Sequence, residues 1–217
     1  KPFYYSYPRL VEFAGMEPVY LKTNLGRIDM DDFREKVKDC RAVLINSPSN
    51  PTGRVEAIPS LKEIETLTSE NGVFVLSDEV YKDLIYIRDN YLIQGPHVVT
   101  INSFSKTYAM CGFRVGYLWS LDDKLVQDVI AMKAHTSMNT NILGQEMAFE
   151  ATKVPQKFID DQLKIWDAQI RAKDLQGTIT LSWSIEQELP ADKAVQLVDL
   201  NTRIVVDMLL MEHLELG

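Results

Sequence analysis

The sequence predicts an α/β fold in which a mostly parallel sheet is flanked by helices. Short apolar runs of strand length alternate along the chain with longer segments of helical periodicity, which is the pattern of α/β domains. The run Val73–Ser77 is apolar at nearly every position, as expected for a strand that is covered on both faces. With 217 residues, of which 46% are apolar and 25% charged, the chain can form a substantial core.

The individual elements follow from this periodicity and from local start and stop signals. In one helix, Ser60 and Glu63 have the spacing of a capping box and Gly72 marks the end. The predicted strands are Pro18–Leu21, Ala42–Asn46, Val73–Ser77, Val98–Ser103 and Arg114–Trp119. The predicted helices are Asp31–Cys40, Ser60–Glu70, a segment that starts around Ser120 and Asp123 and runs through Met132, and Asn141–Thr152.

The last part of the chain is predicted to start a smaller α+β domain. Pro155 stands at a first helical position, and its helix is expected to continue to about Leu175. We therefore expect a large domain in residues 1–153, followed in residues 154–217 by a connecting helix and part of a small domain. Strands at Thr178–Trp183 and Ala194–Leu200 and a helix from Arg203 to Leu214 are predicted to follow.

Composition and charge exclude several classes of function. A net charge of −8 disfavours nucleic acid and anionic membranes as main partners. Cys40 and Cys111 form no CxxC motif and no disulfide framework, which is typical of a reducing compartment. No apolar run approaches the roughly 18–20 residues of a membrane span, and no signal peptide is visible. We therefore expect a cytoplasmic protein without a membrane or nucleic-acid partner.

Common catalytic and metal-binding motifs are also absent from the sequence. It contains no GxxxxGK[ST], GxGxxG, GxSxG or HExxH pattern. His97, His135 and His213 are scattered without metal-ligand spacing, so we predict no metal site.

Three motifs carry the functional signal. The stretch Ser103-Phe104-Ser105-Lys106 places a lysine just past a predicted strand, and Arg114 follows eight residues later. A lysine among apolar and aromatic neighbours loses its proton more easily, which suits an amine that forms a Schiff base. The other two motifs, upstream, are Asn46-Ser47-Pro48-Ser49-Asn50-Pro51-Thr52-Gly53 and Leu76-Ser77-Asp78-Glu79-Val80-Tyr81.

In this order and at these distances, the motifs resemble those of the class I/II aminotransferases, the aspartate aminotransferase-like group of fold-type I pyridoxal 5'-phosphate (PLP) enzymes. The resemblance is close from Lys1 to about Lys153. It implies a PLP-dependent transferase that exchanges an amino group between an α-amino acid and a 2-oxo acid through a lysine Schiff base. It also implies a homodimer, because the family builds each active site at a dimer interface.

The resemblance assigns catalytic roles to three matching positions. Lys106 would bind PLP covalently and later move the proton during catalysis. Asp78, which ends an apolar strand, would pair with the pyridinium nitrogen of the cofactor. Tyr81 would donate to the phenolic oxygen of PLP, and Asn50 would share that oxygen while also forming a turn before Pro51.

The remaining cofactor contacts concern the phosphate and the ring face. Ser103 and Arg114 would bind the phosphate, for which the forked guanidinium is well suited. Ser105 is a further candidate, although its hydroxyl could instead cap the backbone. Tyr4, counted back from Ala14-Gly15, would stack on the ring of the cofactor, whereas we interpret Tyr5 and Tyr7 as packing residues.

Parts of the family pattern are not recognisable in this chain. They are the N-terminal segment with a backbone phosphate-binding turn and the C-terminal region with an arginine for the substrate carboxylate. The 217 residues alone are therefore expected to be a poor enzyme. Two alternatives stay open: another PLP enzyme on this scaffold, such as a β-eliminating lyase or an ACC-synthase-like enzyme, and a non-catalytic ligand-binding domain. The latter predicts an attached basic helix-turn-helix, which the sequence lacks.

Overall fold

The computed structural model describes residues 2–24, 26–86 and 90–165 and four short strands that follow them. The chain divides into two compact units, Lys1–Val154 and Pro155–Gly217. The interpretation of these units as a PLP-binding domain and part of a small domain stays a prediction. Within the described part of the chain, no helix combines the length and apolarity that a membrane crossing needs.

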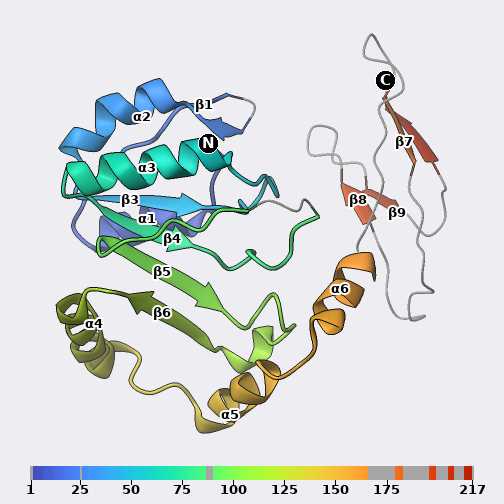
Figure 1. Ribbon diagram of the computed structural model, residues 1–217. Helices are drawn as coiled ribbons and strands as arrows, with labels where there is room; N and C mark the ends of the chain where they lie inside the picture. Colours follow the sequence, from blue (N-terminus) through green and yellow to red (C-terminus); the bar gives the residue numbers. More distant parts are fainter. Residues whose placement is uncertain are drawn as a thin grey trace. The chain divides into compact units, whose positions relative to one another are not determined.

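The first unit is built on a four-stranded mixed sheet with the strand order β3-β4-β5-β6 (Figure 1). The first three of these strands are parallel, whereas β6 is antiparallel to β5. The prediction of an α/β fold with a mostly parallel sheet is therefore confirmed. The strands are β3 (Ala42–Asn46), β4 (Phe74–Asp78), β5 (Val98–Ser103) and β6 (Gly116–Ser120).

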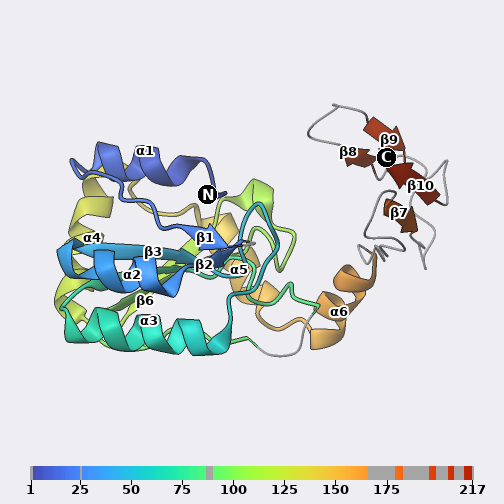
Figure 2. The same cartoon turned by 90° about the horizontal axis from the view of Figure 1, so that it is seen from above.

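Helices flank this sheet, and Figure 2 shows α1 and α3 on opposite sides of it. Along β4 the burial alternates: Val75 and Ser77 are buried, whereas Phe74 is 37% exposed. The prediction that this strand is covered on both faces is thus wrong at Phe74. The helices of this unit are α1 (Ser6–Phe13), α2 (Met30–Lys36), α3 (Ile58–Glu70), α4 (Asp123–Thr136) and α5 (Ile142–Ala151), with 3-10 turns at Val37–Asp39 and Cys111–Phe113.

The main core lies between the sheet and the helices α2 and α3. Its apolar side chains come from one face of each element, as their 3.6- and 2-residue periodicities require. The core residues are Phe33, Val37, Val43, Ile45, Leu61, Ile64, Val73, Val75, Ile93 and Val98.

Two helix starts differ from the predictions for a local reason. The helix α3 begins at Ile58, two residues early, because Pro59 fits the first helical turn, and Ser60 does not act as the N-cap. At α4 the cap is Asp122, whose Oδ1 accepts the Leu125 amide at 3.0 Å. Ser120 is instead the last residue of β6.

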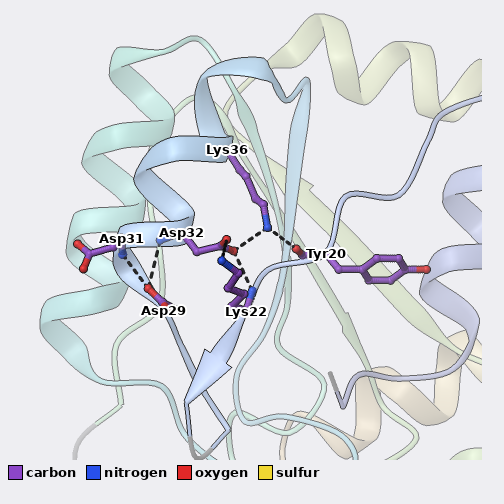
Figure 3. A network of polar contacts seen from close by, with 6 residues as sticks. All are labelled: Tyr20, Lys22, Asp29, Asp31, Asp32 and Lys36. Atoms are coloured by element: carbon purple, nitrogen blue, oxygen red, sulfur yellow. Dashed lines mark hydrogen bonds and ion pairs between the residues drawn. The ribbon is translucent and has the colours of Figure 1, made fainter.

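The predicted strand Pro18–Leu21 is wrong, and Figure 3 shows the polar network that replaces it. The Lys36 ammonium donates to the Tyr20 carbonyl at 2.8 Å and to Asp32 Oδ2 at 2.8 Å. The same Asp32 oxygen accepts the Lys22 amide at 2.8 Å. Side chains of α2 therefore bind the polar backbone groups that a sheet would otherwise pair. The first strands are the short hairpin pair β1 (Thr23–Asn24) and β2 (Arg27–Ile28).

The second unit begins with the helix α6 (Gln156–Ile165), and the predicted continuation of this helix to Leu175 lies outside the described residues. Strands β7 (Ile179–Ser182) and β8 (Gln196–Val198) fall within the two predicted strands. The predicted helix from Arg203 to Leu214 is wrong, because β9 (Val205–Asp207) pairs with β8 and β10 (His213–Leu216) pairs with β7. The consecutive β-branched residues Val205 and Val206 favour a strand over a helix.

Candidate active site

The candidate site lies at the carboxyl ends of the three parallel strands. Asn46 is aligned with Asp78, and Asp78 with Ile101, so β3, β4 and β5 end at the same edge of the sheet. Open α/β sheets bind ligands at this edge. It brings together all three sequence motifs, although they are separated by more than twenty residues along the chain.

The Asp78 carboxylate is held at both of its oxygen atoms. The Tyr7 hydroxyl donates to Oδ2 at 2.6 Å, and the Val80 amide donates to Oδ1 at 3.2 Å. Burial and the adjacent Asp78 carboxylate raise the pKa of Tyr7, so that its hydroxyl stays a donor over the whole working pH range. The carboxylate is thereby fixed in orientation, with lone pairs remaining for a further cationic partner.

Directly after β4, Glu79 is buried, and its Oε1 accepts the Ser77 hydroxyl at 3.0 Å. Burial raises the pKa of the Glu79 carboxyl. Neighbouring carboxyls at the end of β4 therefore have different environments, since Asp78 is bound by a tyrosine and a backbone amide.

A second group of contacts, centred on Tyr81, joins the motif of Asp78 to the motifs that carry Asn50 and Lys106. Asn50 Nδ2 donates to the Tyr81 hydroxyl at 3.3 Å. The Lys106 ammonium lies over the Tyr81 ring, with Nζ 5.8 Å from its centroid. A primary amine, a phenol and an amide are thus neighbours, as the resemblance requires for Lys106, Tyr81 and Asn50.

Asn46 connects these two groups, and its role was missed in the sequence. Its side-chain amide donates to the Asp78 carbonyl oxygen at 3.2 Å, while its Oδ1 accepts the Asn50 amide at 2.7 Å. One side chain therefore braces both the end of β4 and the loop that carries Asn50. Its position, at the end of β3 and at the start of one of the three motifs, was the available signal.

Tyr7 was also missed, since it was interpreted as a packing residue. Tyr4 lies before α1, and its ring centroid is 5.4 Å from that of Tyr7 in an edge contact. Tyr4 is therefore placed beside the residue that holds Asp78. The spacing of three residues was the available signal, since a single turn, closed here by the Tyr7 amide donating to the Tyr4 carbonyl at 3.1 Å, brings residues at this spacing together.

The candidate phosphate ligands lie around the turn after β5. Ser103 Oγ accepts the Ser105 amide at 2.9 Å, so the hydroxyl that caps the backbone is that of Ser103 and its hydrogen can point outward. Arg114 is exposed, and its Nη1 donates to the Cys111 carbonyl at 2.9 Å. Its backbone has φ 57°, a left-handed conformation that is uncommon for a residue other than glycine.

A cavity of about 470 Å³ borders this site, but the Lys106 amine is not part of its lining. Tyr7, Asn46 and Asn50 contribute to its largely apolar wall, whereas Lys106 and Asp78 lie outside the lining. The candidate site is therefore defined by its side-chain chemistry and not by this cavity.

The residues present fit the functional groups of PLP. In that cofactor the phenolic oxygen and the aldehyde stand on adjacent ring carbons, and the pyridine nitrogen lies on the far side of the ring. Correspondingly, Tyr81 lies next to the Lys106 amine and is bonded by Asn50, while a separately anchored carboxylate, Asp78, ends the neighbouring β-strand. The donor set is thus that of an electrophilic pyridinium cofactor held by a lysine.

The structure is thus that of an α/β protein whose candidate ligand site, with Lys106 in it, lies at the ends of its parallel strands. Residues 1–176 match the model of the family described as aminotransferase class I and II. The chain therefore belongs to the class I and II aminotransferases, a fold-type I family that depends on PLP.

Individual relatives agree with this assignment. The chain is 30% identical over 180 residues to an aspartate aminotransferase of Bacillus sp. (strain YM-2), which covers 78% of this chain and 46% of the relative. It is 39% identical over 127 residues to aromatic-amino-acid aminotransferase 2 of Thermococcus litoralis, covering 54% of this chain and 33% of the relative. The chain thus spans less than half the length of these relatives.

Solved structures show the same fold over the first part of the chain. The aromatic aminotransferase of Pyrococcus horikoshii superposes with a TM-score of 0.72 and 31% identity, covering 77% of this chain and 48% of that one. A mutant of the aspartate aminotransferase of Thermus thermophilus superposes with a TM-score of 0.70 and 25% identity, covering 76% of this chain and 48% of that one.

Proposed function

We propose that this protein is a PLP-dependent aminotransferase that exchanges an amino group between an α-amino acid and a 2-oxo acid. The observation that carries the proposal is the placement of the Lys106 amine over the Tyr81 ring, with Asn50 bound to the hydroxyl of the same tyrosine. PLP, when bound, supplies a carbonyl that combines with amines and a ring that withdraws electrons from the substrate carbon. The protein has to hold the cofactor, orient it toward the substrate, and protonate the atoms that need a proton.

Each residue of the site has one of these tasks in the proposal. Asp78, oriented by Tyr7, would keep a proton on the ring nitrogen, and Tyr81 with Asn50 would donate to the phenolic oxygen. Lys106 would hold the cofactor covalently and, once released by the substrate amine, move the proton at the substrate α-carbon.

The anchoring contacts complete the proposal. Ser103 and Arg114 would bind the phosphate, and Ser105 is a further candidate for the same group. Tyr4 would cover one face of the ring. We assign no residue to the substrate carboxylate, because Arg114 is already assigned to the phosphate and the sequence motifs point to no other arginine.

The proposal is tested by locating the cofactor. The protein is incubated with PLP, reduced with borohydride and digested, and the modified peptide is identified by mass spectrometry. We expect the pyridoxyl group on Lys106. Label on a different lysine, or unlabelled protein that nevertheless binds PLP, would contradict the assignment. Transfer of the amino group from an amino acid to a 2-oxo acid then separates transamination from elimination chemistry.

We further propose that the working form is a homodimer. Large apolar side chains are exposed on β6 and α5, among them Trp119, Phe149 and Leu143, the last of them 73% exposed. Exposed apolar surface of this extent marks interaction sites or aggregation. Sedimentation over a range of concentrations should show self-association that Leu143→Glu weakens, while a strictly monomeric protein would refute the proposal.

A further inference from the structure

A hydrogen bond outside the expected site connects the two turns that carry Tyr81 and Lys106. The Thr107 hydroxyl donates to Asp83 Oδ2 at 3.3 Å. Thr107 is only 2% exposed, so its hydroxyl needs a partner inside the protein. Asp83 supplies that partner from the preceding strand–turn segment, 24 residues earlier in the chain.

The two turns have the same construction. In the turn after β4, Tyr81 is followed two residues later by Asp83, and the Leu84 amide closes the turn by donating to the Tyr81 carbonyl at 2.9 Å. In the turn after β5, Lys106 is followed directly by Thr107, and the Ala109 amide donates to the Lys106 carbonyl at 3.1 Å. Each turn therefore carries one candidate reacting residue and one half of the hydrogen bond.

We infer that Asp83 and Thr107 form a latch that holds the Lys106 amine against Tyr81. The inference rests on the proposed function, since it concerns the same lysine. Lys106 is itself exposed, and its contact with the ring spans 5.8 Å. Because such a contact is weak at an exposed site, the part-buried hydroxyl–carboxylate bond next to it has to keep the two turns in register. Asp83 and Thr107 are positioning residues in this account, because neither touches the reacting atoms.

The latch can be tested first without cofactor. Lysines of the unliganded protein are acylated at limiting reagent, and the extent at Lys106 is compared with that at Lys62, which lies 5.4 Å from the centroid of the Tyr91 ring in the same kind of contact. In Thr107→Val and Asp83→Ala, release of Lys106 from the ring should raise its relative acylation by about two- to fivefold. Lys62 should be unaffected.

The second readout is the affinity for PLP, measured through the visible absorption of the bound cofactor. Either substitution should weaken binding by about tenfold, as expected for a lost hydrogen bond to a charged group. The double variant should be no weaker than either single one, because the two residues act through one bond. Asp83→Asn keeps an acceptor oxygen and should restore most of the affinity.

Thr68→Val is the matched control. Thr68 is likewise fully buried, and its hydroxyl donates to the Ile64 carbonyl at 2.6 Å within α3. This variant should lose stability without a change at Lys106. If Thr107→Val behaves like the control in both readouts, or if the two latch substitutions add independently, the latch is refuted. If the unsubstituted protein takes up no PLP on Lys106, the proposed function fails. The latch is then tested only by the acylation of Lys106 relative to Lys62.

Discussion

The two sides of the sheet edge are supported in different ways. On the side of β3 and β4, Asp78, Asn50 and Tyr81 are joined to one another or to the scaffold by hydrogen bonds through Tyr7 and Asn46. These strands also carry the buried core beneath α2 and α3. On the side of β6, four of the five strand residues are exposed, and all of α4 is at least partly exposed.

If the proposed roles hold, this difference means that the residues proposed to bind the ring are arranged in advance and those proposed to bind the phosphate are not. Arg114, on the β6 side, is exposed, and within the described part of the chain its side chain bonds only to Cys111 in its own turn. A site of this kind should recognise the pyridine ring by fixed groups, whereas its anion-binding part must gain order from the ligand or from a second subunit. Substitutions on the two sides should therefore differ in what they change.

The largest effect is expected for Asp78→Asn on the prearranged side. Loss of the negative charge that faces the pyridinium should slow proton removal from the substrate α-carbon by about 100- to 1,000-fold, because breaking a buried charge pair is costly. Exchange of the α-proton of an amino acid in deuterated water measures this step. PLP should still bind. Near-normal exchange would remove Asp78 from the catalytic role.

The control for this variant has to be chosen from the structure. Asp83 belongs to none of the sequence motifs, but it is unsuitable as a control because its carboxylate accepts a hydrogen bond from the hydroxyl of buried Thr107. Asp128 is suitable, since its exposed carboxylate pairs with Lys124 within α4, 2.7 Å away, and with no other residue of the described ranges. Asp128→Asn should leave the exchange rate unchanged.

Arg114→Ala should produce the next largest effect. It should change the affinity for PLP and not the rate of proton removal. Removing the guanidinium should weaken PLP by about 10- to 100-fold, the loss expected for a charge-assisted contact to a phosphate. Pyridoxal, which lacks the phosphate, should bind both proteins equally well. Equal losses for PLP and pyridoxal would mean that Arg114 acts on the fold of its turn and not on the phosphate.

Much of the fold and of the site was predictable, because each depended on local patterns. The strand Val98–Ser103 was predicted with its observed bounds, since a short apolar run ending in polar residues has few other interpretations. The grouping of Lys106, Tyr81 and Asn50 was expected from the resemblance of their motifs to the family, and for Asp78 it also agreed with the rule that open α/β sheets bind ligands at the strand ends.

The missed features depend on contacts between distant segments. Nothing local in Pro18–Leu21 shows that Lys36 will bind its backbone. Tyr7 meets Asp78 across 71 residues, and aromatic residues are common in ordinary packing, so its hydroxyl bond could not be read from composition. Apolar periodicity in residues 203–214 suggested a helix, whereas strand pairing within the second unit decided against it.

Tyr7→Phe should have an intermediate effect that is specific to the prearranged side. The variant keeps the ring but removes the 2.6 Å hydrogen bond to Asp78, so proton exchange should slow by about tenfold. In the Asp78→Asn background the same substitution should have little further effect. Tyr5→Phe is the control, because Tyr5 is 78% exposed. An equal loss in both backgrounds would show that Tyr7 does not act through Asp78.

The smallest effect on the site is expected for Asp32→Asn, which probes the prearranged side far from the cofactor. Hydrogen bonds from Lys36 and from the Lys22 amide hold the pKa of the Asp32 carboxyl below its ordinary value. A depressed folded pKa stabilises the protein at neutral pH, and this contribution is lost as the pH falls through the unfolded value of about 3.9 toward the folded one.

Urea unfolding should therefore show Asp32→Asn to be less stable than the parent at pH 7, with a smaller difference at pH 3. PLP affinity at pH 7 should be unchanged, because the network orders α2 and the segment before it and not the strand ends. A stability difference that does not shrink in acid would mean that the carboxylate charge at Asp32 is not what stabilises this region.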